Sequence, residues 1–221
     1  MKRSEHLPQE GVRSKRHAEK RHRIREAARD IFCLRGYVDA TTREICEKSG
    51  VGNGTLFRHA SDKRELLLLI VNDDLDALHI DTGKRILAAK TRRPLRERIL
   101  QFYRVRYDYF AKYPQISRPY VKEVFNFMGV KEKDVGPEAR KHLMRRRAVV
   151  AEVEKIIADD ARTRKAAGAD TQLIADLIHA IYLSASREWA ESTKLDVAVG
   201  MRRLSVLLDL AAVGFRADWR E

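Results

Sequence analysis

The stretch ATTREICEKSGVGNGTLFRH, residues 40–59, decides the fold, because its signals predict two short helices joined by a tight turn. Thr41 and Glu44 form a Thr-x-x-Glu box, in which the hydroxyl and the carboxylate satisfy free backbone N–H groups at a helix start. Gly50 provides the typical end of that helix. A second short helix is predicted over residues 53–59. The turn between the two helices is therefore short and glycine-bearing.

The segments on either side of this stretch also have helical spacing. Upstream, five apolar side chains recur three or four residues apart and form one stripe: Ile24, Ala27, Ala28, Ile31 and Phe32. Gly36 ends this first helix. Downstream, Asp62 and Glu65 make a box-like start for a helix through the apolar residues 66–71. Two short helices backed by a third are the parts of a helix-turn-helix, whose second helix enters the major groove of DNA.

Polar side chains in this motif have the chemistry needed to contact DNA. Groups suited to a phosphate stand at the two helix starts: Thr41, Thr42, Arg43 and Lys63. Groups suited to base edges follow between them: Asn53, Thr55, Arg58 and His59. Taken singly, each has an ordinary alternative explanation, since Asn53 can simply cap a helix and Lys63 or His59 can be a surface or partly packed residue.

The ordered series of motifs closely resembles the TetR family of bacterial transcription regulators. It comprises Arg35-Gly36-Tyr37, the runs from Ala40 to Ile45 and from Gly50 to His59, and the segment from Asp62 to Leu67, so that it covers about residues 21–71. By this resemblance the DNA-contacting set also includes Gly52, Gly54 and Phe57. The joint occurrence of these residues in one matched segment outweighs the ordinary explanation of each alone.

The resemblance implies an all-helical homodimer that binds a double-stranded, palindromic DNA operator and usually represses transcription. A small-molecule effector that binds the variable C-terminal domain then releases the DNA. The chain departs from the family pattern at three positions. Phe57 stands where a tyrosine is frequent and lacks its hydroxyl, Gly52 replaces a common serine, and Ala60 stands where an aromatic residue usually closes the motif.

The charge of the chain agrees with a nucleic-acid partner. Its 221 residues carry a formal net charge of +13, which attracts nucleic acid or an anionic membrane surface. Residues 1–25 hold nine Lys or Arg against three acids. We predict a basic disordered arm over residues 1–20, a DNA-binding domain over 21–66 and a ligand-sensing and dimerisation domain over 67–221. The alternative is a basic helical protein that binds nucleic acid or an anionic membrane without sequence preference.

Other sequence features narrow the function classes. The two cysteines, Cys33 and Cys46, match neither a zinc framework nor a disulfide scaffold. The longest apolar run, residues 66–71, is far too short to cross a bilayer, so the cytoplasm is the expected compartment, without a membrane partner. The chain has no glycine-rich phosphate loop, paired metal-ligand motif or nucleophile elbow, so we expect no enzyme activity, no cofactor and no metal.

The C-terminal half has two helical seams that suit helix pairing. One seam is Ile174, Ile178, Ile181 and Ala185, and the other is Val197, Met201, Leu204, Leu208, Ala211 and Phe215. The family resemblance implies that such a terminal helix pair forms a four-helix interface with its copy. Packing inside one chain is the competing explanation for both seams.

Aromatic and sulfur-containing side chains gather in the middle of the chain, as expected for an apolar ligand pocket with a few polar anchors. The candidate pocket residues are Phe102, Tyr103, Tyr107, Phe125, Met128, Met144, His179 and Tyr182. For most of them taken singly, an ordinary core position is the favoured explanation. The pocket is therefore implied by the family resemblance, and the sequence does not name its ligand.

Overall fold

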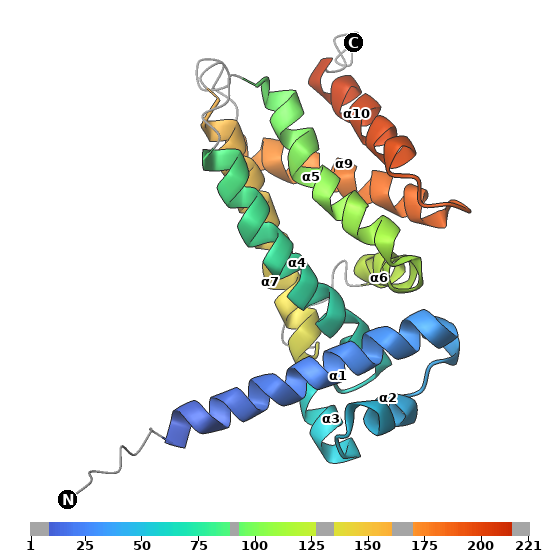
Figure 1. Ribbon diagram of the computed structural model, residues 1–221. Helices are drawn as coiled ribbons and strands as arrows, with labels where there is room; N and C mark the ends of the chain where they lie inside the picture. Colours follow the sequence, from blue (N-terminus) through green and yellow to red (C-terminus); the bar gives the residue numbers. More distant parts are fainter. Residues whose placement is uncertain (1–8, 89–92, 127–134, 161–169, 214–221) are drawn as a thin grey trace, which may run out of the picture.

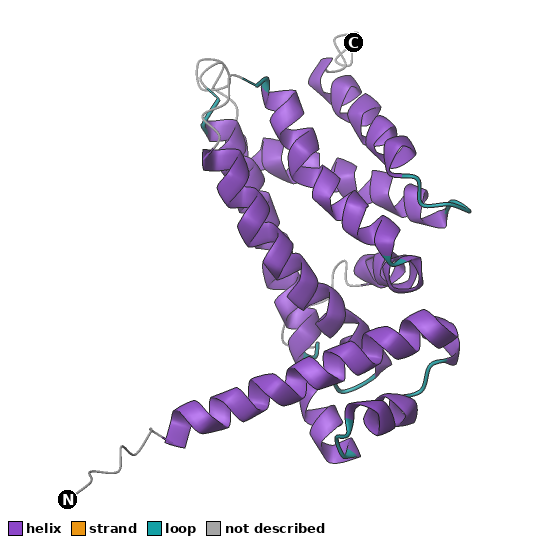
Figure 2. Ribbon diagram, in the orientation of Figure 1, coloured by secondary structure: helices purple, strands orange, loops and turns teal. Residues whose placement is uncertain are grey.

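The computed structural model describes residues 9–88, 93–126, 135–160 and 170–213, all of whose regular structure is helical (Figures 1 and 2). The prediction of an all-α fold is confirmed. The helices are α1 (Gln9–Asp39), α2 (Thr42–Ser49), α3 (Asn53–His59), α4 (Lys63–Ala88), α5 (Leu95–Lys112), α6 (Pro114–Asn126), α7 (Pro137–Ala158), α9 (Thr171–Glu191) and α10 (Val197–Val213). Within the described ranges, no helix has the length and apolar character needed to cross a membrane.

The N-terminal domain is built by the short-range signals of its sequence. The Thr41 hydroxyl accepts a hydrogen bond from the Glu44 backbone N–H at 3.2 Å, and the Glu44 carboxylate accepts one from the Thr41 N–H at 2.9 Å. Gly50 ends α2 in the left-handed conformation, with φ of 63°, and Gly36 breaks α1 near its end, with φ of 79°. Both positive φ values suit glycine, which has no Cβ to clash with the backbone. The predicted capping box and both glycine breaks are confirmed.

A single apolar core holds α1, α2, α3 and the start of α4 together. Ile24 and Phe32 from α1, Ile45 from α2, Leu56 from α3 and Leu66 from α4 are all fully buried. Each comes from the apolar face of its helix, where buried residues alternate with half-buried and exposed ones. The three-helix unit therefore presents the remaining faces of α2 and α3 outward, at one end of the molecule (Figure 1).

The predicted disorder of the basic arm is wrong for residues 9–20, which continue α1 as a helix that extends away from the rest of the molecule (Figure 1). Residues 1–8 lie outside the described ranges. The physical reason is that residues rich in Lys, Arg, Glu and Ala have good helix propensity, and a helix already nucleated by its packed part is extended at little cost. High charge alone therefore did not indicate disorder.

The long helix α4 joins the two domains. It begins at Lys63 beside the short helices and runs through the predicted domain boundary at residue 66 into the larger domain. Its apolar run, residues 66–71, is completely buried. α7 lies along α4, and α9 packs against α7 and α10. α5, α6, α9 and α10 complete the larger helical domain, which is the second domain that the sequence predicts (Figure 1).

Candidate functional site

The outer face of α2 and α3 brings together most of the residues predicted to contact DNA. Seven of them are exposed: Thr41, Arg43, Gly52, Asn53, Gly54, Phe57 and Arg58. Thr42 and Thr55 are half-buried beside them. The Phe57 ring is 48% exposed although phenylalanine normally lies in a core, so that it forms an apolar platform between polar groups. This face offers hydroxyl, amide, guanidinium and aromatic groups on one surface.

Two predicted DNA contacts have a different place in the structure. The His59 ring is buried, and its centroid lies 4.4 Å from that of His17 in α1, so His59 faces the interior and not the outer surface of α3. Lys63 donates hydrogen bonds from Nζ to the carbonyl oxygens of Val38 at 2.7 Å and Ala40 at 3.1 Å. The sequence places both residues beside the motif, but neither side chain is presented as the phosphate or base contact that we predicted.

The start of α4 also differs from its predicted capping box. Asp62 accepts a hydrogen bond from the Glu65 backbone N–H at 2.8 Å, as expected. The Glu65 carboxylate, however, accepts hydrogen bonds from the backbone N–H groups of Glu138 at 2.8 Å and Ala139 at 2.9 Å. These N–H groups belong to the first turn of α7, whose positive dipole end attracts the carboxylate. Glu65 therefore connects the start of α4 to the start of α7.

A network of charged side chains surrounds this connection. Arg21 of α1 donates to Asp73 at 2.7 Å and to Glu138 at 2.6 Å. Lys141 of α7 donates to Asp73 at 2.9 Å, and Arg145 donates to Asp76. The pKa of Asp73 is lowered although burial opposes this, because Arg21 and Lys141 stabilise the carboxylate. The network ties α1 to α4 and α7.

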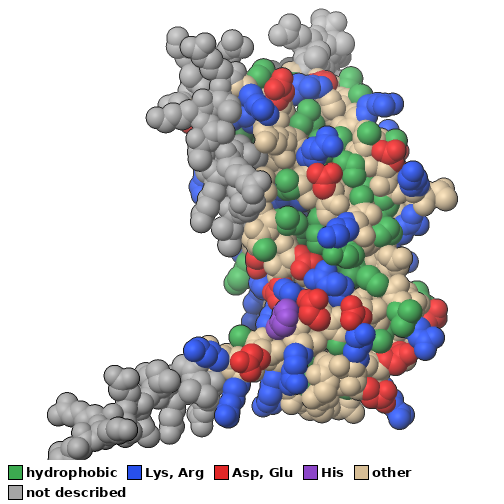
Figure 3. Space-filling model, in the orientation of Figure 1, with side chains coloured by type: hydrophobic (Ala, Val, Ile, Leu, Met, Phe, Trp, Pro, Cys, Tyr) green, Lys and Arg blue, Asp and Glu red, His purple; other side chains and the backbone are tan. Residues whose placement is uncertain are grey.

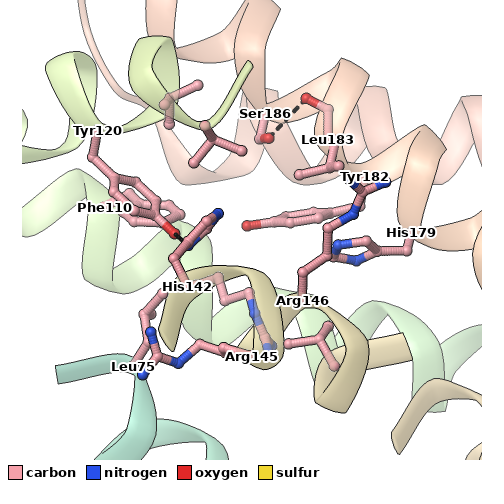
Figure 4. A pocket seen from close by; sticks show the side chains of 14 residues that line it. Leu75, Phe110, Tyr120, His142, Arg145, Arg146, His179, Tyr182, Leu183 and Ser186 are labelled. Carbon is pink, nitrogen blue, oxygen red and sulfur yellow. Dashed lines mark hydrogen bonds between the residues drawn. The ribbon is translucent and has the colours of Figure 1, made fainter. Parts of the chain in front are cut away.

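A small cavity of about 50 Å³ lies inside the larger domain, between α4, α5, α6, α7 and α9 (Figure 4). Its lining comprises Leu75, Arg106, Phe110, Tyr120, Val121, Val124, His142, Arg145, Arg146, Val149, His179, Tyr182, Leu183 and Ser186. The Tyr120 hydroxyl oxygen lies 3.3 Å from His142 Nδ1, and the Tyr103 hydroxyl oxygen lies 3.2 Å from His179 Nδ1. The cavity is thus apolar with a few polar groups.

The predicted ligand residues divide into four groups. His179 and Tyr182 line the cavity. Phe102, Tyr103 and Tyr107 are buried core residues outside the lining, and Met144 is 54% exposed, so a place for Met144 in the cavity wall is wrong. The Phe125 side chain and Met128 lie outside the described parts of the chain. Three other lining residues were not predicted from the sequence: Arg106, His142 and Arg146. Polar and charged residues on an amphipathic helix are normally expected on its solvent-exposed face.

The helical seams of α9 and α10 belong partly to the core of one chain. Ala185 and Leu204 are buried at 1% and 0% exposure, so placing these two in a dimer interface is wrong, and Leu208 is also buried. Ile174, Ile178, Ile181 and Met201 are half-buried, Ala211 is exposed, and Phe215 lies outside the described ranges. Helical spacing reveals a buried stripe but not which surface covers it, which is why the seams were ambiguous.

Large apolar side chains remain exposed next to these seams. They are Leu173 and Leu177 on α9, and Val199, Val206 and Leu210 on α10. An open groove of about 360 Å³ runs between α5, α9 and α10 and is lined largely by aliphatic side chains. Hydrophobic side chains reach the surface among charged ones on the face that carries α5 and α10 (Figure 3). A contiguous apolar area of this kind is typical of an interaction surface.

Comparison with known proteins identifies the N-terminal motif. Residues 24–70 match the family model described as bacterial regulatory proteins, tetR family. The N-terminal region of the chain is therefore of the TetR family. An HTH-type transcriptional regulator of Staphylococcus aureus is 38% identical over 58 residues, which are 26% of this chain and 31% of that protein. The match therefore spans about a third of that relative's length.

Solved structures extend the similarity from the N-terminal region to the fold of most of the chain. FadR of Thermus thermophilus, a TetR family repressor solved with lauroyl-CoA, has a TM-score of 0.62 at 22% identity, over 85% of this chain and 93% of that one. A TetR-family regulator of Pectobacterium atrosepticum has a TM-score of 0.60 at 23% identity, over 89% and 94%. At these identities the comparison shows the shared fold.

Proposed function

We propose that this protein is a transcriptional regulator that binds a palindromic double-stranded DNA operator as a homodimer, with its DNA-binding domain at residues 21–66. The observation that carries the proposal is the exposed surface of α2 and α3, to which Asn53, Phe57 and Arg58 of α3 all contribute exposed side chains. A helix start offers backbone N–H groups to a phosphate, and side chains on the second helix reach base edges. His59 and Lys63 are left out of the proposed contact set.

Selection of bound fragments from the source genome tests this proposal. We expect recovered fragments to share two inverted half-sites about one DNA turn, roughly 34 Å, apart, because a two-fold dimer presents two copies of α3. Asn53→Ala should relax the preference at one position of each half-site. Binding that is equal for all sequences and depends only on salt would instead support the non-specific basic protein.

Gly54 provides a sharper test of the same surface. A Cβ built at Gly54 meets no atom within 4 Å, so nothing in the folded chain requires glycine in this helix. Alanine is favoured over glycine in a helix interior by up to about 1 kcal/mol. Gly54→Ala should therefore stabilise the protein in urea unfolding, yet weaken operator binding about tenfold, because the methyl group occupies space that the DNA backbone or a base approaches. Gly200, by contrast, cannot be replaced by alanine without a clash inside the chain, since its Cβ would lie 2.6 Å from Tyr107. Unchanged operator affinity in Gly54→Ala would remove α3 from the interface.

The effector is proposed to bind the cavity of the larger domain and to release the DNA, so that the protein acts as a repressor in the cytoplasm. Two neighbours in fold, the FadR proteins of Thermus thermophilus and Bacillus subtilis, were solved with lauroyl-CoA and stearoyl-CoA, which supports a small-molecule ligand with an apolar part. α7 supplies His142 and Arg146 to the cavity wall and is held to α4 by Glu65. A ligand that displaces α7 would thus move the helix that begins beside α3.

The dimer is proposed to form through α9 and α10. Leu177 and Leu210 are more than half exposed, as are three other large apolar residues on these helices. Burying such side chains between two copies removes apolar surface from water, at about 25 cal/mol for each Å². The half-buried residues of the two seams would line the edge of this interface.

A further inference from the structure

The cavity in the larger domain has an unusual charge for an apolar site. Among the described residues that line it, three are arginines and none is Asp or Glu. Arg106 is only 6% exposed and comes from α5, whereas Arg145 and Arg146 come from α7. Positive charge taken out of water is costly unless an opposite charge or a hydrogen-bond acceptor is near. An anion in the cavity would therefore meet three positive charges and no carboxylate among the lining residues that the structure describes.

The three arginines have different surroundings. Arg145 is held by Asn72 and Asp76 of α4, which lie outside the lining. Arg106 donates to the Phe102 carbonyl oxygen at 3.0 Å, and its guanidinium carbon lies 4.6 Å from the centre of the Phe102 ring. Arg146 lines the cavity and is exposed to solvent, so its guanidinium can turn toward a bound group. Figure 4 shows Arg146 beside Tyr182 and His179.

Neutral donors stand beside these cations. Burial, and after it the charges of Arg145 and Arg146, lowers the pKa of His142 to about 4. Burial, and after it the charge of Arg106, lowers the pKa of His179 to about 3. When the Tyr120 hydroxyl donates to Nδ1 of His142, the imidazole proton lies on Nε2, which is then a donor. The field that acts on both imidazoles is thus positive, as an anion would require.

We propose that the effector is a small organic carboxylate, with its carboxylate held by Arg106 and Arg146 and its apolar body against Phe110, Tyr182 and Val149. Guanidinium groups bind carboxylates through two parallel hydrogen bonds, which makes them suited to this head group. The proposal rests on the proposed function, because it names the ligand class of the same cavity. It also separates this protein from an acyl thioester binder, whose acyl tail brings no charge into the site.

The size of the cavity links binding to movement. A volume of about 50 Å³ is far below the roughly 300–1,000 Å³ of ligand pockets, so the cavity as it stands cannot enclose a ligand that has both a carboxylate and an apolar body. The apolar body must therefore separate α6 from α7 and α9, which carry the opposing walls. A bound anion that attracts Arg145 also competes with Asp76 for the Arg145 guanidinium. Asp76 belongs to α4, the helix that begins at the proposed DNA-binding domain.

Calorimetric titration of the full chain tests the ligand class. The probes are benzoate, phenylacetate and octanoate at pH 7, each paired with its neutral amide, together with octanoyl-CoA. We expect at least one carboxylate to bind, and to bind at least about tenfold more tightly than its amide, because charge-assisted hydrogen bonds to arginine are the strong ones. The proposal is overturned if acid and amide bind equally, if octanoyl-CoA binds and no free acid does, or if no acid binds at millimolar concentration.

Variants locate the binding site. Arg106→Gln and the exposed Arg146→Gln should each weaken the carboxylate at least about tenfold and leave its amide unchanged. Arg147→Gln is the matched control, because Arg147 is an exposed neighbour on α7 that does not line the cavity. If Arg146→Gln binds the carboxylate as tightly as the unchanged protein does, the assignment is wrong even if Arg106→Gln fails to fold. None of these titrations contains DNA. A negative result would therefore overturn the carboxylate proposal alone, and the proposed DNA-binding function would still be tested by the fragment selection.

Discussion

Lowering the pH from 7 to about 4.5 is expected to reduce the free energy of unfolding by about 5 kcal/mol, mainly through two buried histidines. The pKa of His142 is about 4 and that of His179 about 3 in the folded protein, against 6.5 for an ordinary histidine. A group whose folded pKa is depressed binds more protons in the unfolded state, so stability is lost as the pH falls below 6.5. At pH 4.5 each histidine is roughly two pH units below its unfolded pKa, and each of these units lowers the free energy of unfolding by about 1.4 kcal/mol.

The carboxylates of the charged network titrate in a lower window. The pKa values of Asp73 and Asp76 are lowered in the folded protein, because hydrogen bonds to basic side chains outweigh the effect of burial. Their contribution is fully present above the ordinary aspartate pKa of 3.8 and is lost only as the pH falls through the folded values. The loss between pH 6.5 and 4.5 therefore belongs mainly to the histidines.

Urea unfolding at a series of pH values measures this effect. His142→Asn and His179→Asn keep a polar atom close to the position of Nδ1 but cannot titrate, so each variant should lose about half of the acid sensitivity, whatever its stability at pH 7. His22→Asn is the matched control, since His22 is exposed on α1. An unaltered pH profile in the double variant His142→Asn/His179→Asn would show that other groups cause the acid loss.

Glu65→Ala is expected to destabilise the protein by roughly 3 kcal/mol, because two buried backbone N–H groups at the start of α7 lose their acceptor. Glu65 is 1% exposed, and its two carboxylate oxygens lie 2.8 Å and 2.9 Å from the N atoms of Glu138 and Ala139. The site is closely packed, since a Cβ at Gly136 would lie 2.6 Å from the Glu65 carboxyl carbon. Water therefore has little room to replace the carboxylate.

The same change should weaken the coupling between the domains. Without Glu65, α7 can move without the start of α4, so an effector that binds the cavity should change operator affinity less in Glu65→Ala than in the unchanged protein. Glu65→Gln keeps one acceptor oxygen, so its stability should lie between that of Glu65→Ala and that of the unchanged protein. Glu97→Ala is the control, because Glu97 is an exposed acid in the first turn of α5, and its loss should change stability by less than about 0.5 kcal/mol. If Glu65→Ala is no less stable than Glu97→Ala, the Glu65 carboxylate contributes nothing to holding α7.

Sequence reasoning was most accurate where the signal is local. The box of Thr41 and Glu44, the turn at Gly50 and the short helix from Asn53 were all predicted, because a cap or a left-handed glycine depends on residues within one helical turn. The apolar stripe that includes Ile24 and Phe32 was predicted for the same reason, since helical spacing identifies a buried face. The fold class and the family follow from these signals.

Side chains near the motif show the limit of local signals. From the sequence, the adjacent acids Asp73 and Asp74 are expected on a solvent-exposed helix face. In the structure, Asp73 instead binds Arg21 and Lys141, and Asp74 binds Arg29 at 2.7 Å. His59 has the right spacing for a base contact but is covered by α1. Nothing within one helical turn of these residues indicates the partner, because each partner comes from another helix.

By itself, the sequence determined an all-helical chain with a TetR-like helix-turn-helix at its N-terminal end, since caps, turns and apolar periodicity act over a few residues. Only the tertiary structure decided which polar groups of the motif are exposed, which seam residues are core, and where the cavity lies. Arg106 and His179 are 73 positions apart in the chain, and their shared cavity exists only because α5 and α9 pack beside each other and α7. Burial and electrostatic partners at such separations depend on helix packing, which no local pattern specifies.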